Sequence, residues 1–510
     1  MNVLVPLPFA LPLLGAALAM ISRRRETWLR VLAPLVGAGV VAAAAGLVAA
    51  VARDGVIAVQ MGGWPAPLGI TLVADRLSAL LLVVSAGVLL AIMLHAVGEG
   101  AGGLGRHEPG VFYPAYLTLT AGVCLLFLAG DLFNLFVAFE VMLASSYVLM
   151  TLTPTAERMR AGMTYTVVSL TSSILFLTAL GLTYAAAGTV NLADLSARVD
   201  ALPPGTRSAL GMLFLVVFGI KGAIVPMHLW LPDAYPAALT KVTAVFAALL
   251  TKAAIYALIR VQTLLFPHEH GSWIMLALAA GTMLVGTLGA LTHDDIHRVF
   301  SFTLVGHIGY MLFGLGLFSV AGLTGAILYL VHHIVVQATL FLVSDLMQGR
   351  TGETSLHRLG GLAQLSSFIA VLFFVPAMSV SGVPPTSGFV AKLALFQAGL
   401  GEGRPLAYAV TGVAVLASLL TLIAMSRIWA LGFWRPRPEG VPEPPAEPPD
   451  DESYTRGGVR VMQSVTAVMV VAGLLIAVFA GPLSSWSRRA AIDLLDPSAY
   501  RQAVLSGESR

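Results

Sequence analysis

Long apolar runs separated by short polar loops are the main pattern along this chain. Each run is long enough to cross a bilayer as a helix, which takes about 20 residues. Fourteen such runs lie near residues 3–20, 31–51, 70–95, 112–129, 131–152, 162–187, 208–229, 241–265, 272–291, 298–318, 322–347, 364–396, 405–433 and 461–483. The pattern predicts an all-α membrane protein with about 14 transmembrane helices embedded in the lipid bilayer.

The composition supports a membrane protein and excludes several other classes. Hydrophobic residues make up 57% of the chain and charged residues 11%, whereas soluble domains carry about 25% charged residues. A net charge of only +3 gives no reason to expect nucleic acid as a partner. The sequence has no GxGxxG before a helix, no Walker A sequence, no CxxC and no HExxH, so we expect no cofactor, no metal and no enzyme activity of the chain by itself.

Basic residues in the loops predict the orientation of the spans. Lys and Arg are more numerous in the loops after odd-numbered spans, so those loops should be cytoplasmic and both termini extracytoplasmic. The first run lacks a basic segment before it and is followed by three arginines at 23–25, which indicates a span and not a cleaved signal. Residues 434–460 are rich in proline and acidic residues, which predicts a poorly ordered cytoplasmic linker.

The lysines have an unusual distribution. Only four of the 29 basic residues are lysines; Lys221, Lys252 and Lys392 fall inside predicted spans, and Lys241 opens one. Arginine holds its proton at any accessible pH, whereas a buried lysine can release it. A buried lysine can also extend to the membrane surface or form a static ion pair. Because charge at membrane depth is costly and is functional by default, three such lysines predict proton exchange within the membrane.

Other titratable residues share this depth. Glu140 follows Asp131 by nine residues, which places it about 14 Å along the helix and close to the bilayer centre. His332 and His333 lie in the middle of one span, and their side chains point about 100° apart, so they can bridge two neighbours. His307 is a weaker candidate, because a lone buried histidine is often only packed. Asp131 is a weaker candidate as well.

Prolines interrupt two of the spans that carry these lysines. Pro226 follows Lys221 by five residues and has no N–H, so the carbonyl of Gly222 should lose its helical partner. An open backbone group at membrane depth is tolerated only within protein or beside a wet cavity. The sequence therefore predicts a broken seventh helix with an exposed polar backbone next to its lysine.

The twelfth span has the same components in the opposite order. Pro384 and Pro385 should free the carbonyls of Val380 and Ser381, and Lys392 follows just beyond them. A lysine before one break and after the other predicts inverted repeats with ion sites at their interface. The alternative is that these prolines only kink their helices. The predicted divisions are helices 1–3 (1–111), the first five-helix repeat (112–265), the second repeat (272–433), the linker (434–460), and helix 14 with the tail (461–510).

Several motifs carry a resemblance to a known family. They are "FVAFEVML", "FGIKGAIVPMHLWLPDA", "ALLTKAAIYALIR", "HDDIHRVFSFTLVGHIGYML" and "SGVPPTSGFVAKL". Together they resemble the antiporter-like subunits shared by respiratory complex I, membrane-bound hydrogenases and Mrp-type cation/proton antiporters. The resemblance covers nearly the whole chain and is strongest over 112–433. Within the family, "DLFNLFVAFEVMLASSYVL" looks more like the D-type subunits of Mrp antiporters than like the complex I subunits.

The resemblance implies roles for the charged residues. By matching position, Glu140 pairs with Lys221, and the proton path continues along the axis through Lys252, His332, His333 and the distal Lys392. One position departs from the family pattern: Gln337 stands where relatives often have lysine. Glutamine does not take a proton, so the histidines or water must cover that stretch.

The implied function is proton translocation within a hetero-oligomeric Mrp-type antiporter in the bacterial plasma membrane. It would exchange protons for a monovalent cation, with Na⁺ expected, and its partners would be the other subunits. A proton-pumping subunit of a complex I-like or hydrogenase redox complex would use the same residues. A structural subunit that no longer conducts ions is the second alternative, and the full set of Glu and Lys argues against it.

Overall fold

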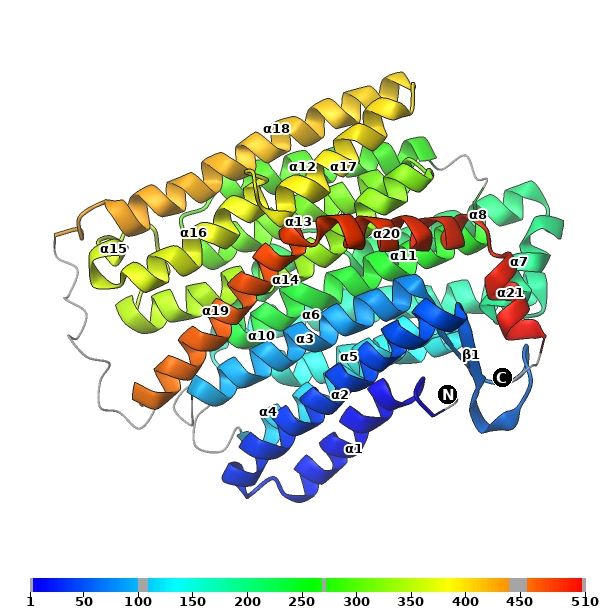
Figure 1. The fold of residues 1–510 in the computed structure, drawn as a ribbon, viewed down its shortest axis with the longest axis horizontal. Coiled ribbons are helices and arrows are strands. Elements are labelled where there is room, and N and C mark those ends of the chain that lie inside the picture. Colours follow the sequence, from blue (N-terminus) through cyan, green and yellow to red (C-terminus); the bar gives the residue numbers. More distant parts are fainter. Residues whose placement is uncertain (1–2, 100–108, 268–271, 440–455, 507–510) are drawn as a thin grey trace.

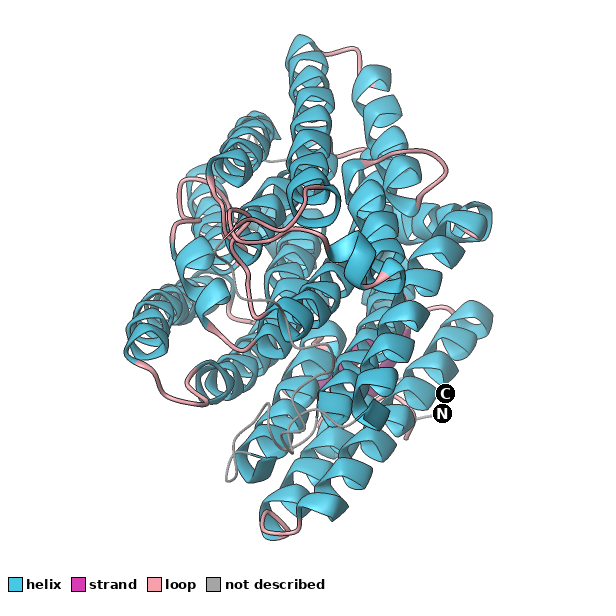
Figure 2. Ribbon diagram, turned by 90° about the vertical axis from the view of Figure 1, so that its left-hand side faces the viewer, coloured by secondary structure: helices cyan, strands magenta, loops and turns pink. Residues whose placement is uncertain are grey.

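A computed structural model describes residues 3–99, 109–267, 272–439 and 456–506. The chain forms an elongated bundle of helices that run mostly side by side (Figures 1 and 2). The first half contains α1 (Leu7–Ile21), α2 (Glu26–Asp54), α3 (Arg76–Glu99), α4 (Pro109–Leu128), α5 (Leu132–Met150), α6 (Ala156–Ala187), α7 (Leu192–Arg198), α8 (Pro204–Lys221), α9 (Trp230–Ala234), α10 (Thr240–Val245) and α11 (Thr251–Leu265). The second half contains α12 (Ser272–Thr292), α13 (Ile296–Gly316), α14 (Val320–Thr351), α15 (Leu362–Leu365), α16 (Ser367–Ser381), α17 (Ser387–Gly401), α18 (Pro405–Ile428), α19 (Arg456–Val478), α20 (Ala480–Leu495) and α21 (Ser498–Leu505).

The prediction of an all-α membrane protein is confirmed. Within the described residues, 11 helices are long and apolar enough to cross a membrane. Each of the fourteen predicted spans contains a helix, including the shorter apolar helices α1 and α16. The count of fourteen crossings stays a prediction, because several spans are divided into pieces too short to decide by length.

A small hairpin corrects the start of the third predicted span. Strands β1 (Ile57–Gln60) and β2 (Thr71–Ala74) pair antiparallel, and α3 begins only at Arg76. The side chain of Asp75 accepts a bond from the Ser78 N–H at 2.9 Å, which caps the first turn of α3. Only two charged residues, Asp75 and Arg76, stand between the apolar β2 and the apolar part of α3, so a hydropathy average over a whole span does not separate them. We call this end of the bundle the hairpin end.

The C-terminal region also differs from the prediction. The expected span 461–483 is divided into α19 and α20, which meet at Phe479 at an angle that Figure 1 shows. The chain then returns to the hairpin end, where Gln60 Nε2 donates to the Val504 carbonyl of α21 at 3.4 Å. Helix α1 begins at this same end (Figure 1). Of the predicted linker 434–460, residues 440–455 lie outside the described residues.

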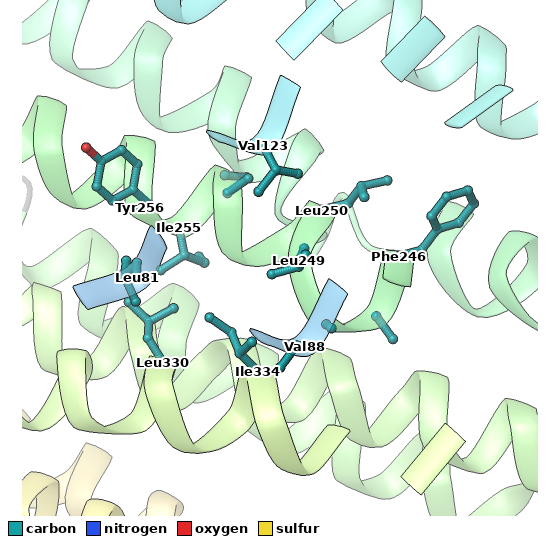
Figure 3. Packing of buried hydrophobic residues seen from close by; sticks show 14 of the residues in the cluster. Leu81, Val88, Val123, Phe246, Leu249, Leu250, Ile255, Tyr256, Leu330 and Ile334 are labelled. Atoms are coloured by element: carbon teal, nitrogen blue, oxygen red, sulfur yellow. The ribbon is translucent and has the colours of Figure 1, made fainter. Parts of the chain in front are cut away.

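Two buried helical segments form the centre of the bundle. Helix α14 packs against α3, α10, α13, α16, α17, α19 and α20. The second segment runs from α10 through a π-helical turn, η4 (Phe246–Leu250), into α11. Every residue of it from Lys241 to Leu265 is buried. In Figure 3, Phe246, Leu249, Leu250, Ile255 and Tyr256 of this segment lie among Leu81 and Val88 of α3, Val123 of α4, and Leu330 and Ile334 of α14. The two lysines and the two histidines on these segments are therefore held inside the protein, away from lipid.

Candidate functional site

The first helix break lies next to Lys221, as the sequence predicts. Lys221 is the last residue of α8, and the backbone leaves the helix over 222–229, with Ala223 at φ 54°. The break begins at Gly222, four residues before Pro226, so the proline lies inside the irregular segment. Trp230 Nε1 donates to the Ile220 carbonyl at 3.0 Å and so satisfies one of the carbonyls that the helix end leaves open. The lysine is thereby fixed at the edge of the break.

Glu140 of α5 and Lys221 of α8 meet through a hydroxyl group of α6. The Ser173 hydroxyl donates to the Glu140 carboxylate, and Lys221 Nζ donates to Ser173 Oγ at 3.1 Å. The ammonium also lies 5.0 Å from the centroid of the Phe139 ring, a cation–π distance. A hydroxyl that accepts from an ammonium and donates to a carboxylate can pass a proton between them by shifting both hydrogen bonds. Sequence reasoning missed Ser173, and the only signal was its place in a serine pair at membrane depth.

Lys252 lies directly after the π-helical turn. It is the second residue of α11, its side chain is buried, and its Nζ donates to the Ala247 carbonyl within η4. Single π turns in α-helices occur frequently at functional sites. No proline or glycine marks this turn in the sequence, so the backbone feature could not be predicted.

The histidines form a cluster between α13 and α14. The rings of His307 and His333 lie 5.0 Å apart, and His307 Nδ1 is 2.7 Å from the Tyr329 hydroxyl. Lys252 interacts electrostatically with both histidines. All of these histidine and lysine side chains are buried. The structure thus brings His307, the weaker sequence candidate, into the same cluster as the predicted pair.

His332 points toward the second helix break. Its Nδ1 lies 2.9 Å from Ser387 Oγ, the first residue of α17, and Ser387 Oγ lies 3.1 Å from Ser379 Oγ of α16. Adjacent histidines on one helix therefore contact different neighbours, His333 the α13 side and His332 the α16–α17 break. This is the bridging geometry that their 100° separation predicts.

Lys392 is seated on the second break. Helix α16 ends at Ser381, Gly382 has φ 83°, and α17 begins at Ser387. Lys392 Nζ donates to the carbonyls of Val380 at 3.0 Å and Ser381 at 3.1 Å. These are the two carbonyls that Pro384 and Pro385 were expected to free. A third bond, to Ser418 Oγ of α18 at 3.0 Å, completes the three that an ammonium can donate.

Two tyrosines connect Lys392 with the histidine cluster. Lys392 Nζ lies 5.0 Å from the centroid of the Tyr310 ring, which stacks on Tyr329 at 5.1 Å. Tyr329 in turn contacts His307. The second half of the site is therefore continuous from lysine to histidine through aromatic and hydroxyl groups, none of which the sequence singled out.

Gln337 lies one turn beyond His333 on α14. It is fully buried, and its Nε2 donates to the Phe300 carbonyl of α13 at 3.2 Å. The amide thus tethers α14 to α13. Because an amide does not titrate, Gln337 supplies a hydrogen bond but cannot take up and release a proton as a lysine could.

Asp131 lies apart from these residues, at the hairpin end. It precedes α5 as its N-cap, accepts from the Asn134 N–H at 2.6 Å, and pairs through its backbone with Asn191. Burial raises the pKa of this carboxyl from 3.8 to about 6. The contacts of Asp131 are those of a helix cap.

Several buried nitrogens in the histidine cluster have no protein partner among the described residues. They are Nε2 of His307 and His332 and both ring nitrogens of His333. Buried polar groups are normally hydrogen-bonded, and ordered water satisfies those that protein leaves open. The cluster is therefore suited to hold water between its titratable groups. Among the residues that the structure describes, no group of three His, Cys, Asp or Glu could hold a metal ion.

Other buried charged groups were missed by the sequence reasoning. Lys241 pairs with Glu99, and His95 Nε2 lies 3.0 Å from Asp345 Oδ2, all at the end opposite the hairpin. Lys241 stands at the start of a predicted span, where a lysine usually marks only the membrane surface. At the hairpin end, Arg260 contacts Asp75 at 2.6 Å.

A comparison with protein families matches residues 129–421 to the transmembrane family of NADH:quinone oxidoreductase and Mrp antiporter subunits. The match covers both helix breaks and all the candidate residues from Glu140 to Lys392. The chain belongs to this family. The matched region contains the series of candidate residues that we call the row from Glu140 to Lys392: Glu140, Lys221, Lys252, His307, His332, His333 and Lys392.

Relatives within the family are similar over nearly the full length. The D-type subunit of the Na⁺/H⁺ antiporter of Alkalihalophilus pseudofirmus is 36% identical over 509 residues, 99% of this chain and 100% of the relative. A chain of the Mrp complex from Dietzia sp. is 34% identical and superimposes with a TM-score of 0.90, covering 99% and 100% of the two chains. A chain of respiratory complex I from Thermus thermophilus is 24% identical, with a TM-score of 0.79 over 96% and 99% of the two chains, and shares the fold.

Proposed function

We propose that this chain is the proton-translocating subunit of a multi-subunit monovalent cation/proton antiporter. The observation that carries the proposal is the bonded series Glu140–Ser173–Lys221 beside a helix break. Full-length similarity to the D-type subunit of a Na⁺/H⁺ antiporter supports the assignment and makes Na⁺ the expected cation. The partners are then the other subunits of such a complex.

The first part of the mechanism is a charge pair whose connection can be changed. While Ser173 links them, the Glu140 carboxylate stabilises the ammonium of Lys221. If the break beside Lys221 moves the ammonium away, the buried charge loses its partner, and release of the proton becomes favourable. The proton leaves on the side of Lys252, and Ser173 allows Lys221 to be recharged from Glu140.

The second part is the row from Lys252 to Lys392. A proton arriving at Lys252 is relayed by neutral imidazoles, which accept at one nitrogen and donate from the other. His333 and His307 lie ring to ring and interact electrostatically with Lys252, whereas His332 Nδ1 lies beside Ser387 Oγ at the second break. Lys392 has three neutral acceptors. Without a carboxylate bonded to it, this ammonium depends on the break to stay protonated.

The division into repeats and the orientation belong to this proposal. The two five-helix units, 112–265 and 272–433, each contain one broken helix and one lysine at the break. In the bacterial plasma membrane, the hairpin end with both described chain ends would be extracytoplasmic. The opposite end, which carries the three arginines at 23–25, would be cytoplasmic.

A proton pump driven by a redox reaction remains the rival function, because it would use the same row. The 36% identity to an antiporter subunit exceeds the 24% identity to the complex I chain and favours the antiporter. Subunit identification of the purified complex separates the two: other antiporter subunits support our proposal, and hydrogenase or quinone-reductase subunits contradict it.

The function itself is tested in membrane vesicles that contain the complex. Addition of Na⁺ to acid-loaded vesicles should release protons, as followed with a pH-sensitive dye. Glu140→Ala and Lys221→Ala should each abolish this exchange at normal yield of the assembled complex. Exchange at the wild-type rate in either variant would overturn the proposed pair, and the non-conducting alternative would gain support if the wild type itself showed none.

A further inference from the structure

A large cavity opens at the end of the bundle opposite the hairpin. Its volume is about 810 Å³, and it lies among the ends of α3, α6, α10, α13 and α14. Charged and titratable side chains line it, including Glu99, Arg158, Lys241, His297 and Asp345. A polar cavity of this size holds many water molecules. None of these residues belongs to the row from Glu140 to Lys392.

Three side chains of this cavity, Glu99, Lys241 and Asp345, form two acid–base pairs together with His95, which lies behind the cavity wall; we call these four residues the Lys241 cluster. Lys241 of α10 donates to the Glu99 carboxylate of α3, and the two side chains are only 2% and 9% exposed. Asp345 of α14 lies 3.0 Å from Nε2 of His95, which is fully buried on α3. Two carboxylates, one lysine and one histidine thus converge from three helices. Removing such charges from water is expensive, so a static bridge is a poor explanation for placing them beside a wet cavity.

A polar connection leads inward from the cavity. His297 of α13 lines the cavity, and its Nε2 lies 3.2 Å from Ser344 Oγ of α14. Beyond Ser344, the rings of Phe300 and Phe341 meet edge to face at 5.5 Å. Behind this aromatic contact lies Gln337, bonded to the Phe300 carbonyl, one turn from His333. The Phe300–Phe341 contact therefore lies along α13 and α14 between the cavity-lining His297 and the histidine cluster.

We propose that this cavity is the proton-loading vestibule of the chain and that Glu99 and Lys241 are its acid–base pair. The inference rests on the proposed function and adds a site to it. Glu99 takes a proton from cavity water, and Lys241 releases one through water to His297 and Ser344. The proton on Glu99 then passes to the neutral amine of Lys241, which restores the starting pair with one proton taken up and one delivered. Phe300 and Phe341 separate this loading step from the inner row.

The pair is tested by a double variant that keeps the hydrogen bond and removes titration. Glu99→Gln with Lys241→Gln, and separately Lys241→Arg, should lower cation/proton exchange at least about tenfold at normal complex yield. A static bridge between α3 and α10 would survive the double substitution. Exchange at the wild-type rate in the double variant would therefore overturn the proposal.

A matched control pair lies at the same end of the bundle. Arg30 and Glu26 of α2 form an ion pair at 2.6 Å that is partly exposed. Glu26→Gln with Arg30→Gln should leave exchange unchanged, because this pair lies outside the cavity. Glu140→Ala is measured in parallel. If Glu140→Ala abolishes exchange and the Glu99/Lys241 double variant does not, the vestibule alone is wrong; if the wild type itself shows no exchange, the proposed function is wrong.

Water access to the cavity gives a second measurement that does not depend on transport. The single cysteine, Cys124, is buried and can be replaced by alanine. In that background, Gln348→Cys on the cavity wall should react with a charged, membrane-impermeant thiol reagent added from the cytoplasmic side. Val343→Cys, at a position that is 0% exposed on the same helix, should not react. Failure of Gln348→Cys to react from either side of the membrane would contradict a wet vestibule.

Discussion

Glu140 and Lys221 are joined by a single hydroxyl group, that of Ser173. The three side chains of this link come from α5, α6 and α8, which meet beside the first break. Its geometry means that the two charges need not move together to exchange a proton. It also means that one small side chain controls whether they are connected.

Removal of this hydroxyl tests the link directly. Ser173→Ala should slow cation/proton exchange about tenfold or more, because the proton loses its intermediate position, whereas Ser173→Thr should retain most of the rate. Ser172 is the matched control: it is also buried but donates to the Val217 carbonyl at 3.0 Å. Ser172→Ala should stay within about twofold of the wild type, since it carries no proton in this scheme. Equal rates in Ser173→Ala and the wild type would show that water or direct contact replaces the hydroxyl.

The second prediction concerns proton release at Lys392. Lys392→Arg keeps a positive charge at the second break but cannot give up its proton at working pH. Exchange in vesicles should therefore fall nearly as far as in Lys392→Ala, by about tenfold or more. Restoration of exchange by arginine would mean that Lys392 serves only as a fixed charge on the Val380 and Ser381 carbonyls.

The third prediction separates titration from packing in the histidine cluster. Replacement of both His332 and His333 by glutamine retains hydrogen bonding and much of the side-chain volume but removes the proton relay. Exchange should fall strongly across pH 7 to 9, about tenfold. Gln337→Ala should have little effect on the rate, because that amide only tethers α14 to α13. A wild-type rate in the double glutamine variant would assign the histidines a structural role and leave water to carry the proton.

The fourth prediction is a pH dependence of stability at Asp131. Burial raises its native pKa from 3.8 to about 6, so the native state binds this proton more tightly than the unfolded state. The resulting stabilisation is present below about pH 4 and is lost as the pH rises through 6, a change of ~3 kcal/mol. Asp131→Asn keeps the helix cap and does not titrate. In thermal unfolding of the purified complex, the variant should match the wild type near pH 4 and be more stable at pH 8. A constant difference across this range would contradict the raised pKa.

The candidate lysines and prolines could be located from the sequence because the free energy that each of them costs in a membrane helix does not depend on its neighbours in the fold. A lysine at membrane depth is expensive wherever its neighbours lie, and a proline removes one defined N–H. Counting four residues back from Pro384 and Pro385 identified the Val380 and Ser381 carbonyls, and both accept from Lys392. Residues that are costly by themselves can thus be found without a structure.

The connecting groups could not be found in this way. Serine is common in membrane helices, and Ser173 matters only because three helices meet at it. The π turn before Lys252 has no proline or glycine to mark it, so its π-helical conformation can be recognised only from the backbone of the structure. Lys241 looked like a surface residue because hydropathy places it at a span boundary. Its partner Glu99 is 142 positions away in the sequence, and only the packing of α3 on α10 brings them together.

Because Lys392 donates to the last carbonyls of α16, the protonation of its amine and the backbone conformation of the second break depend on each other. The ammonium replaces the amide donors that the two prolines remove, so it acts as the missing last turn of that helix. When the proton leaves, the neutral amine keeps only two N–H donors, so one of its three bonds, to Val380, Ser381 or Ser418, must break. By thermodynamic reciprocity, anything that reshapes this break changes the proton affinity of Lys392 by the same free energy. A neighbouring subunit or a lipid that presses on the α16–α17 corner would thus adjust ion transport without touching a titratable group.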